Sequence, residues 1–424
     1  MDTVIERCAG LDVHQATVVA SVVIEAGGKR PKRETRTFST VRVGLQALLD
    51  WLLGEGVTHV AMEGTGVYWM AVYAMLEGKL DVAVVNARHV KRVPGRKTDV
   101  SDAAWLAELL RKGLVRKSFV PSPDVRAIRD VSRYRRMLVH SETAEKNRVI
   151  KLLETIGLKL ATFASDVFGK SGMAMLRRIA AGPCPTEQIA QLARGKLRAK
   201  LPDLRRALDC VLAEHHRTML RDQLARLDRT GVDIARYDQM LTEMVEPFSA
   251  QIDLLCTITG VQRTAAIEIF AEVGPDLSSF PDEFHFSSWA GMCPGLNESA
   301  GKKGRARRRR GNPYLQSILI ECALAATRKR DSYHKDKFHR LKARRGSMRA
   351  LFAIAHKLAR AVYRVLTAGQ PYRDLGAGYL DARIKPRVAR TLIERLLALG
   401  YDKNSIVEAF PNPPTPSPDF HASA

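Results

Sequence analysis

The chain has 424 residues, a hydrophobic content of 46% and a formal net charge of +23 at pH 7. This length predicts two or three domains with room for ordinary apolar cores. No run of about 18 apolar residues is present and the N-terminus lacks a signal-peptide pattern, so we expect no membrane partner. The charge predicts a polyanionic partner, and nucleic acid is favoured over an anionic membrane surface.

The distribution of positive charge and the number and spacing of the cysteines indicate the type of partner and the cellular compartment of the protein. The stretch from Lys302 to Arg310 holds seven basic residues, and the rest of the chain is still strongly basic. Six cysteines are scattered without any Cys-x-x-Cys pair, which argues against a zinc site. A reducing cytosol fits this usage, so the sequence predicts a cytoplasmic protein.

Residues 1–122 alternate between predicted strands and helices, a layout typical of an α/β domain. Short apolar runs predict strands, and apolar residues at helical spacing predict helices. The expected strands are Cys8 to Val13, Thr17 to Ile24, Glu34 to Phe38, Val57 to Met62 and Val82 to Val85. The expected helices are Val43 to Leu53, Val67 to Leu76 and Asp99 to Lys112. A hairpin turn is expected at residues 27–29.

Residues 123–250 are interpreted as two long polar helices around a proline-interrupted middle. The first runs from Val125 to about Leu160 and has a basic first half. The second runs from Ala207 to about Phe248 with leucines at helical spacing. The pattern predicts an antiparallel coiled-coil arm. A plain helical linker bundle explains the same pattern equally well.

Residues 251–375 predict a second, mainly helical domain. Its first part, Leu254 to Val273, resembles two helices that turn at Gly260. Such a turn could present backbone N–H groups to a phosphate, or it could be a simple core hairpin. A loop-rich stretch then precedes two helices, Tyr314 to Arg328 and Met348 to Thr367.

The C-terminal part of the sequence has two predicted segments. A small helix, Val388 to Leu399, is expected within residues 376–410. Residues 411–424 are rich in proline and are expected to be disordered.

Four acidic residues in the first quarter of the chain form the pattern of a metal-dependent nuclease. Asp12 and Glu63 lie on or at the ends of predicted buried strands, where a carboxylate without a partner costs several kcal/mol. Asp99 and Asp102 open a predicted helix, and their spacing of three would place both on one face. Converging carboxylates repel one another unless a cation binds them, and oxygen ligands suit Mg²⁺ or Mn²⁺. The alternative is four unrelated surface acids.

Basic residues crowd the approach to Asp99 and are candidates for holding backbone phosphate beside the metal. They are Arg88, Lys91, Arg92, Arg96 and Lys97. A solvated basic loop is the alternative.

Ser299 is a second chemical candidate because it lies in a glycine-flanked loop that leads into the basic run. A serine hydroxyl needs a base or a metal to become a nucleophile, and nearby cations could stabilise a pentavalent phosphorus. The cations are Lys302, Lys303, Arg305, Arg307 and Arg308. From the residues alone, an ordinary loop serine followed by a nonspecific basic arm is the simpler interpretation.

Short motifs in a fixed order resemble a class of bacterial insertion-sequence transposases with a RuvC-like DEDD domain and a C-terminal transposase domain. These enzymes are serine recombinases guided by a bridge RNA. The motifs are Leu11-Asp12-Val13-His14, Met62-Glu63-Gly64-Thr65-Gly66, Lys97-Thr98-Asp99 with Asp102-Ala103, Trp289-Ala290-Gly291, Gly311-Asn312-Pro313 and Gly369-Gln370-Pro371-Tyr372. The sequence departs from the family at Ala300, where a glycine is usual, and at Gly260-Val261-Gln262, where Gly-Ile-Gly is usual.

The resemblance implies an RNase H/RuvC-like α/β domain, a helical coiled-coil arm and a mainly helical C-terminal transposase domain. It makes Asp12, Glu63, Asp99 and Asp102 the metal ligands and Ser299 the nucleophile. It further implies donor and target DNA, a guide RNA and a homo-oligomer, either dimer or tetramer, in the nucleoid of a bacterial cell.

Two other functions compete with recombination through serine. A hydrolytic nuclease or junction resolvase would use the four carboxylates alone, with water as nucleophile. A noncatalytic nucleic-acid-binding protein would satisfy the charge, but it leaves buried carboxylates that repel the ligand unexplained.

Overall fold

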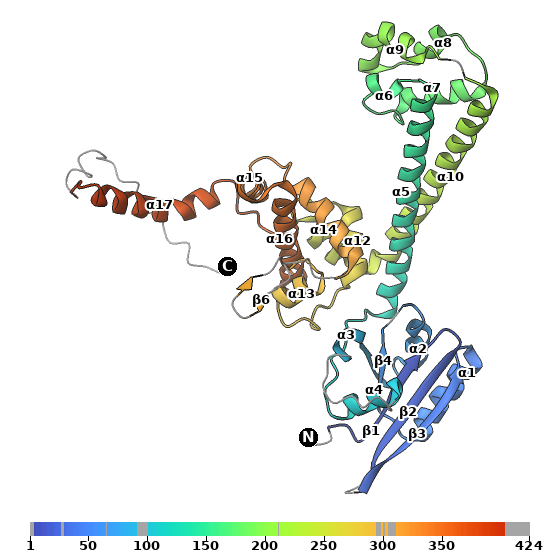
Figure 1. Ribbon diagram of the computed structural model, residues 1–424, viewed down its shortest axis with the longest axis vertical. Coiled ribbons are helices and arrows are strands. Elements are labelled where there is room, and N and C mark those ends of the chain that lie inside the picture. Colours follow the sequence, from blue (N-terminus) through green and yellow to red (C-terminus); the bar gives the residue numbers. More distant parts are fainter. Residues whose placement is uncertain are drawn as a thin grey trace. The chain divides into compact units, whose positions relative to one another are not determined.

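The computed structural model describes residues 4–26, 29–64, 66–90, 101–210, 212–293, 298–299, 302–303 and 311–402 (Figure 1). The chain divides into two units, Met1–Pro121 and Ser122–Ala424. The finer division of the second unit that the sequence suggested, at residues 250, 375 and 410, stays a prediction. No described helix combines the length and apolar character needed to cross a membrane.

The first unit is built on a five-stranded mixed sheet in the order β3-β2-β1-β4-β5. The strands are β1 Arg7–Val13, β2 Thr17–Ala26, β3 Lys29–Ser39, β4 His59–Glu63 and β5 Asp81–Val85. The first three form an antiparallel meander, whereas β1, β4 and β5 run parallel. All five predicted strands are confirmed, and the layout is consistent with a RuvC-like domain.

Helices cover both faces of this sheet. They are α1 Arg42–Gly54, α2 Trp69–Leu76, α3 Ala87–Val90 and α4 Asp102–Arg111. Residues such as Leu11 and Val60 pack with α1 and α2 on one face, whereas Cys8 and Ala61 pack with α4 on the other. This alternation follows from the two-residue period of a strand, so each strand position is assigned to one helical layer.

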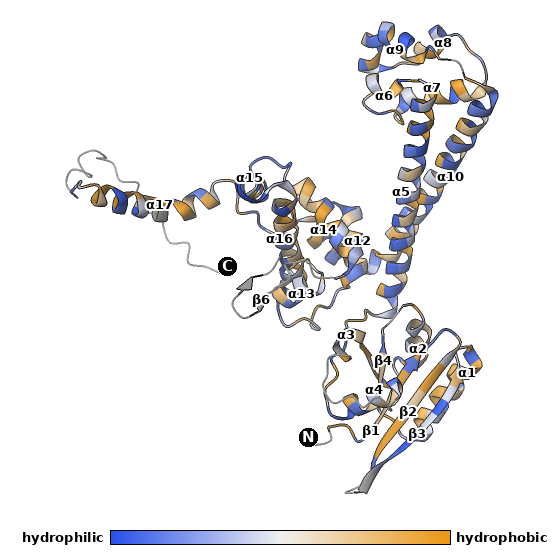
Figure 2. Ribbon diagram, in the orientation of Figure 1, coloured by the Kyte–Doolittle hydropathy of each residue, from blue (hydrophilic) through white to orange (hydrophobic). Residues whose placement is uncertain are grey.

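In the second unit two long polar helices lie side by side, α5 Pro123–Thr155 and α10 Glu214–Met244 (Figure 1). They are antiparallel, because Arg135 binds Asp238 at 2.8 Å while Arg226, earlier in α10, binds Glu145 at 3.1 Å. Much of their outer surface is hydrophilic (Figure 2). Ion pairs therefore hold the middle of the pair, and the coiled-coil character of the arm stays a prediction.

The far ends of α5 and α10 join a cluster of short helices around one apolar core, which includes Leu153, Leu176, Leu204 and Leu220. The short helices are α6 Leu160–Phe163, α7 Lys170–Ala181, α8 Thr186–Ala190, η1 Gly195–Lys200 and α9 Leu201–Leu208. The second long helix thus begins seven residues later than Ala207, the predicted start.

The remaining elements of this unit include a long helix, α16, against which α11, α13, α14 and α15 pack, and Phe270 and Phe286 are completely buried. They are η2 Glu246–Phe248, α11 Ser249–Cys256, α12 Arg263–Val273, α13 Glu283–Trp289, β6 Glu298–Ser299, β7 Lys302–Lys303, α14 Pro313–Ala326, α15 Tyr333–Arg345, α16 Ser347–Ala368 and α17 Tyr379–Ala398.

Further sequence-based expectations differ from the observed helices. The small helix expected from Val388 to Leu399 is the second half of a longer helix, α17, which begins at Tyr379. Helix α13 lies in the stretch that was expected to be loop-rich.

Helix α15 was not expected, because its thirteen residues are mostly charged and carry little apolar periodicity. The helix expected from Asp99 begins at Asp102, since Ser101 has a non-helical ψ of 151° and caps the helix by accepting a hydrogen bond from the backbone N–H of Ala104. Asp99 lies outside the described residues, so the expectation that Asp99 and Asp102 share one helix face is not tested.

Candidate active site

Asp12 and Glu63 lie side by side at the carboxyl ends of two neighbouring parallel strands. The register pairs Leu11 of β1 with Met62 of β4, so the next residue on each strand is one of these acids. Cys8 and Ala61 face α4, and Asp12 and Glu63 stand an even number of residues after them. Both carboxylates are therefore directed to the α4 face of the sheet.

Helix α4 brings a third carboxylate to this face. It packs so closely on β1 that a Cβ atom on Gly10 would lie 2.1 Å from the carbonyl oxygen of Ala103 and 2.4 Å from the nitrogen of Ala107. Only glycine permits this approach. Asp102 is the first residue of α4, where the positive end of the helix dipole favours an anion. The packing at Gly10 thus sets Asp102 over the end of β1.

His14 is a member of the site that the sequence did not single out. Its Nε2 lies 3.2 Å from Oδ2 of Asp12, and the two side chains are 58% and 30% exposed. The signal was the spacing of two at the end of a strand, which directs both side chains to the same side. A histidine beside a carboxylate can orient it or join it in binding a cation.

The donors gathered on this face suit a hard divalent cation, because Asp12, Glu63 and Asp102 all offer carboxylate oxygens. Among the described residues, however, no three His, Cys, Asp or Glu side chains are close enough together to hold a metal ion. Asp99 lies outside the described residues, so the predicted set of four ligands is untested.

Most of the predicted phosphate-binding residues of this unit also lie outside the part of the chain that the structure describes. They are Lys91, Arg92, Arg96 and Lys97. Arg88 belongs to α3, but only its backbone is described. The proposal that these residues bind phosphate rests on their position in the sequence just before α4.

In the second unit, Ser299 lies in a short antiparallel hairpin. Its strand β6 pairs with β7, and Ser299 stands opposite Lys302. The side chains of Ser299, Lys302 and Lys303 are not among those described, and Arg305, Arg307 and Arg308 lie outside the described residues. The pairing places the backbone of Ser299 next to a lysine position.

The segment that carries this hairpin is closed at its base by two glycines. Gly291, with a φ of 72°, follows α13, and Gly311 precedes α14. A Cβ atom on Gly291 would lie 1.9 Å from Nε2 of the buried Gln316 and 2.8 Å from the nitrogen of Gly311. We name residues 292–310 the serine segment, because both of its ends are held by this contact.

Asn312 ties the end of the serine segment to α12 and α5. Its Oδ1 accepts hydrogen bonds from the N–H groups of Tyr314 and Leu315 and so caps α14. Its Nδ2 donates to Oε2 of Glu272 at 2.6 Å, and Arg133 of α5 donates twice to the same carboxylate, at 2.8 Å each. The side chain of Glu272 is only 2% exposed, so three helices share one buried polar joint.

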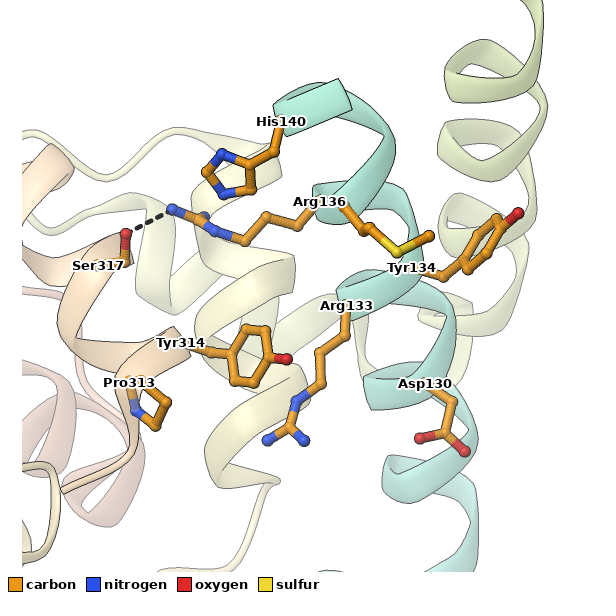
Figure 3. A pocket seen from close by; sticks show the side chains of 9 residues that line it. Asp130, Arg133, Tyr134, Arg136, His140, Pro313, Tyr314 and Ser317 are labelled. Atoms are coloured by element: carbon orange, nitrogen blue, oxygen red, sulfur yellow. Dashed lines mark hydrogen bonds between the residues drawn. The ribbon is translucent and has the colours of Figure 1, made fainter. Parts of the chain in front are cut away.

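An open groove of about 670 Å³ lies beside this joint, between α5 and α14 (Figure 3). The guanidinium of Arg133 lies 4.1 Å from the centre of the Tyr314 ring. Arg136 donates to Ser317 at 2.8 Å and also binds Glu268 and Glu321. The charge of both arginines is thus matched by carboxylates, and the groove is a structural joint rather than an anion site.

The turn at Gly260 is closely packed in the same unit. Gly260 has a φ of 89°, and a Cβ atom there would lie 2.4 Å from the carbonyl oxygen of Cys322 and 2.7 Å from the nitrogen of Ala326. Both neighbouring residues, Thr259 and Val261, are buried. The glycine therefore serves the packing of the turn on α14, which favours the core-hairpin interpretation over phosphate binding.

Comparison with known proteins covers both regions that carry the candidate residues. A family model of DEDD transposases of the IS110 type matches residues 9–157. A second model, described as the transposase IS116/IS110/IS902 family, matches residues 252–339. The chain carries IS110-family transposase domains. The first IS110-family domain includes Asp12, Glu63, Asp99 and Asp102, and the second includes Ser299.

Two relatives extend the likeness along the chain. The transposase for insertion sequence element IS1111A of Coxiella burnetii (strain RSA 493 / Nine Mile phase I) is 27% identical over 300 residues, which are 68% of this chain and 72% of that protein. The predicted transposase y4pF/y4sB of Sinorhizobium fredii (strain NBRC 101917 / NGR234) is 26% identical over 329 residues, 75% of each chain. The likeness to transposases therefore includes residues beyond the two matched domains.

Proposed function

We propose that this protein is an insertion-sequence transposase that cuts and rejoins DNA through a covalent phosphoserine. The observation that carries the proposal is that Asp12 and Glu63 are neighbours at the ends of β1 and β4, on the face covered by α4, which begins at Asp102, in a domain of the IS110 family. Acids that repel one another are retained where they bind a cation and act on phosphate. Bound by these three with Asp99, Mg²⁺ or Mn²⁺ would polarise the scissile phosphate.

The serine conserves the energy of the broken bond. The hydroxyl of Ser299 gives up its proton as Oγ attacks phosphorus, one P–O bond of the DNA backbone breaks, and the departing sugar oxygen takes up a proton in exchange. A sugar hydroxyl of another strand then attacks the phosphoserine, which restores the serine and forms a new phosphodiester. The number of phosphodiester bonds is unchanged, so rejoining needs no nucleotide cofactor. The basic residues within the serine segment would offset the negative charge that develops on phosphorus.

A covalent-adduct experiment tests the role of serine. End-labelled DNA is incubated with the protein and Mg²⁺, and the products are separated on a denaturing gel. We expect label on the unchanged protein and on Ser141→Ala, an exposed serine of α5, but none on Ser299→Ala. Adduct in the Ser299→Ala variant would remove this residue from the mechanism. Cleavage without any adduct would instead favour the hydrolytic nuclease.

The metal site is tested separately. Asp12→Asn keeps the shape of the side chain but removes its charge, and we expect it to lose Mg²⁺-dependent cleavage by at least a hundredfold, roughly the effect of losing a metal ligand. Exposed Asp50→Asn on α1 makes the same charge change away from this face and should cleave normally. Undiminished cleavage by Asp12→Asn would reject the metal assignment.

The proposal includes a guide RNA and a homo-oligomer. The net charge of +23 is compatible with a nucleic-acid partner besides DNA. If both the acids of the first unit and the serine of the second act in the reaction, the phosphate would have to reach both, within one chain or between subunits. Purification from cells that carry the whole element, followed by sequencing of bound RNA and by mass measurement of the particle, tests both points. Particles without RNA, or monomers alone, would contradict them.

A further inference from the structure

Helix α15 and its flanks hold a concentration of positive charge that the site described above does not use. Residues 328–349 contain ten lysines and arginines but only two acids, Asp331 and Asp336. Asp336 is occupied by Arg340, at 2.9 Å. For Lys342, Arg345 and Arg349, no carboxylate partner is recorded anywhere in the described chain, and all three side chains are exposed where α15 meets α16.

The positive charge continues along α16. His356, Lys357, Arg360 and Arg364 follow Arg349 at helical spacing, whereas Ile354, Leu358 and Val362 face the core. Burial and the charges of Arg360 and Lys337 lower the pKa of Lys357. Burial, Arg360 and Lys357 lower the pKa of His356 in the same way. Lys337, Lys357 and Arg360 therefore share one electropositive field, whereas the lowered pKa of His356 favours its neutral form.

One carboxylate partly neutralises the positive charge at the C-terminal end of α16. Glu283 of α13 accepts hydrogen bonds from Arg360 at 2.8 Å and from Arg364 at 3.0 Å. Helix α13 ends at Trp289, two residues before Gly291 at the base of the serine segment. The positive face of α16 thus ends on the helix that leads into the serine segment.

We propose that Lys337, Lys342, Arg345, Arg349 and Lys357 form a basic track that binds the phosphate backbone of duplex DNA. The inference rests on the proposed function, because DNA is the substrate that must reach the serine segment. From Arg349 to Lys357 the helix rises about 12 Å, which matches roughly three to four base pairs of duplex, and the cations of α15 extend the track further. The track reads no bases, so it contributes affinity and orientation rather than sequence preference.

The test removes three exposed cations together: Lys342→Gln, Arg345→Gln and Arg349→Gln. The matched control removes three exposed cations from the cluster of short helices, so its net charge falls by the same amount. Its substitutions are Arg194→Gln, Lys196→Gln and Arg198→Gln. Binding of a labelled 30-base-pair duplex and of a structured RNA is measured from about 50 to 300 mM salt. Circular dichroism and thermal melting verify that both variants are folded.

We expect the track variant to bind duplex about tenfold or more weakly, with a salt dependence lower by about two to three in the log–log slope, while the control matches the unchanged protein. If the two variants bind duplex with equal affinity and equal salt dependence, the basic track is wrong. The proposed function would survive that result, provided that the unchanged protein still binds DNA and forms the Ser299 adduct. A loss confined to RNA would overturn the choice of DNA. An unchanged protein that binds no nucleic acid would overturn the track and the proposed function together.

Discussion

The backbones of Gly291 and Gly311 are in direct contact: a Cβ atom on Gly311 would lie 2.3 Å from the nitrogen of Gly291 and 2.5 Å from its Cα. This contact closes the serine segment, although nineteen residues separate its ends. A closed base restricts where the hairpin with Ser299 can lie, and a nucleophile needs such restriction to meet a phosphate in line.

Gly311→Ala should impair this closure. The added methyl group meets backbone atoms that cannot give way, so we expect about 1–3 kcal/mol of destabilisation and loss of the covalent DNA adduct. Thermal melting and the denaturing-gel assay measure the two effects. Gly231→Ala in α10 is the control, since its Cβ meets nothing within 4 Å and alanine favours a helix. Normal adduct formation by Gly311→Ala would show that the closure is not needed.

Gly10→Ala should disable the acidic face without removing any acid. The new Cβ would meet Ala103 and Ala107 of α4, so the start of that helix and Asp102 must move away from β1. We expect Mg²⁺-dependent cleavage to fall by at least about tenfold, more than thermal stability alone explains. Gly54→Ala, where nothing lies within 4 Å, serves as the control in the same unit. If Gly10→Ala cleaves as well as the control, the position of Asp102 does not matter.

Glu272→Gln should break the buried joint between α5, α12 and α14. Arg133 would lose both of its charged hydrogen bonds, and Arg129, 3.6 Å from the same carboxylate, would lose its counter-charge. Removing one partner of a buried ion pair costs about 3–5 kcal/mol. Chemical unfolding measures the loss, with exposed Glu246→Gln as reference. A change below about 1 kcal/mol would mean that the joint contributes little.

Acid should weaken the contact between α13 and α16. Burial by itself raises the pKa of Glu283, but hydrogen bonds from Arg364 and Arg360 hold it below its usual value. The folded state therefore binds this proton less readily than the unfolded state does, so the contribution to stability is complete above the ordinary pKa of about 4.5. The stabilisation from Glu283 is lost as the pH falls through the lowered pKa that this carboxyl has in the folded protein.

The variant Glu283→Gln isolates this effect. It should be less stable than the unchanged protein at pH 7, and the difference should shrink as pH falls below about 4.5. Unfolding followed between pH 3 and 7 measures it, with Glu243→Gln as the control, an exposed residue whose partner is the neutral amide of Gln239. A difference that does not change with pH would contradict the role of the carboxylate.

Local patterns predicted much of the first unit because its strands alternate between two helical layers. The five strands and the places of Asp12 and Glu63 at strand ends follow from that alternation. The start of α4 was placed too early because helical periodicity was extended through Ser101, a residue whose backbone is not helical. Helix α15 was missed because charged residues, not regularly spaced apolar ones, dominate its sequence. The same charged residues form part of the proposed basic track.

The sequence by itself determined the strands of the first unit, the polar character of the long helices, the acidic and serine candidates and the excess of positive charge, since each depends on neighbouring residues or on composition. Only the tertiary structure decided that Gly10 sets α4 on β1, that Gly291 meets Gly311 and that the arginines of α5 are matched by Glu268 and Glu272. These contacts join residues far apart in the chain. Such contacts depend on the packing of whole elements, which local spacing does not encode.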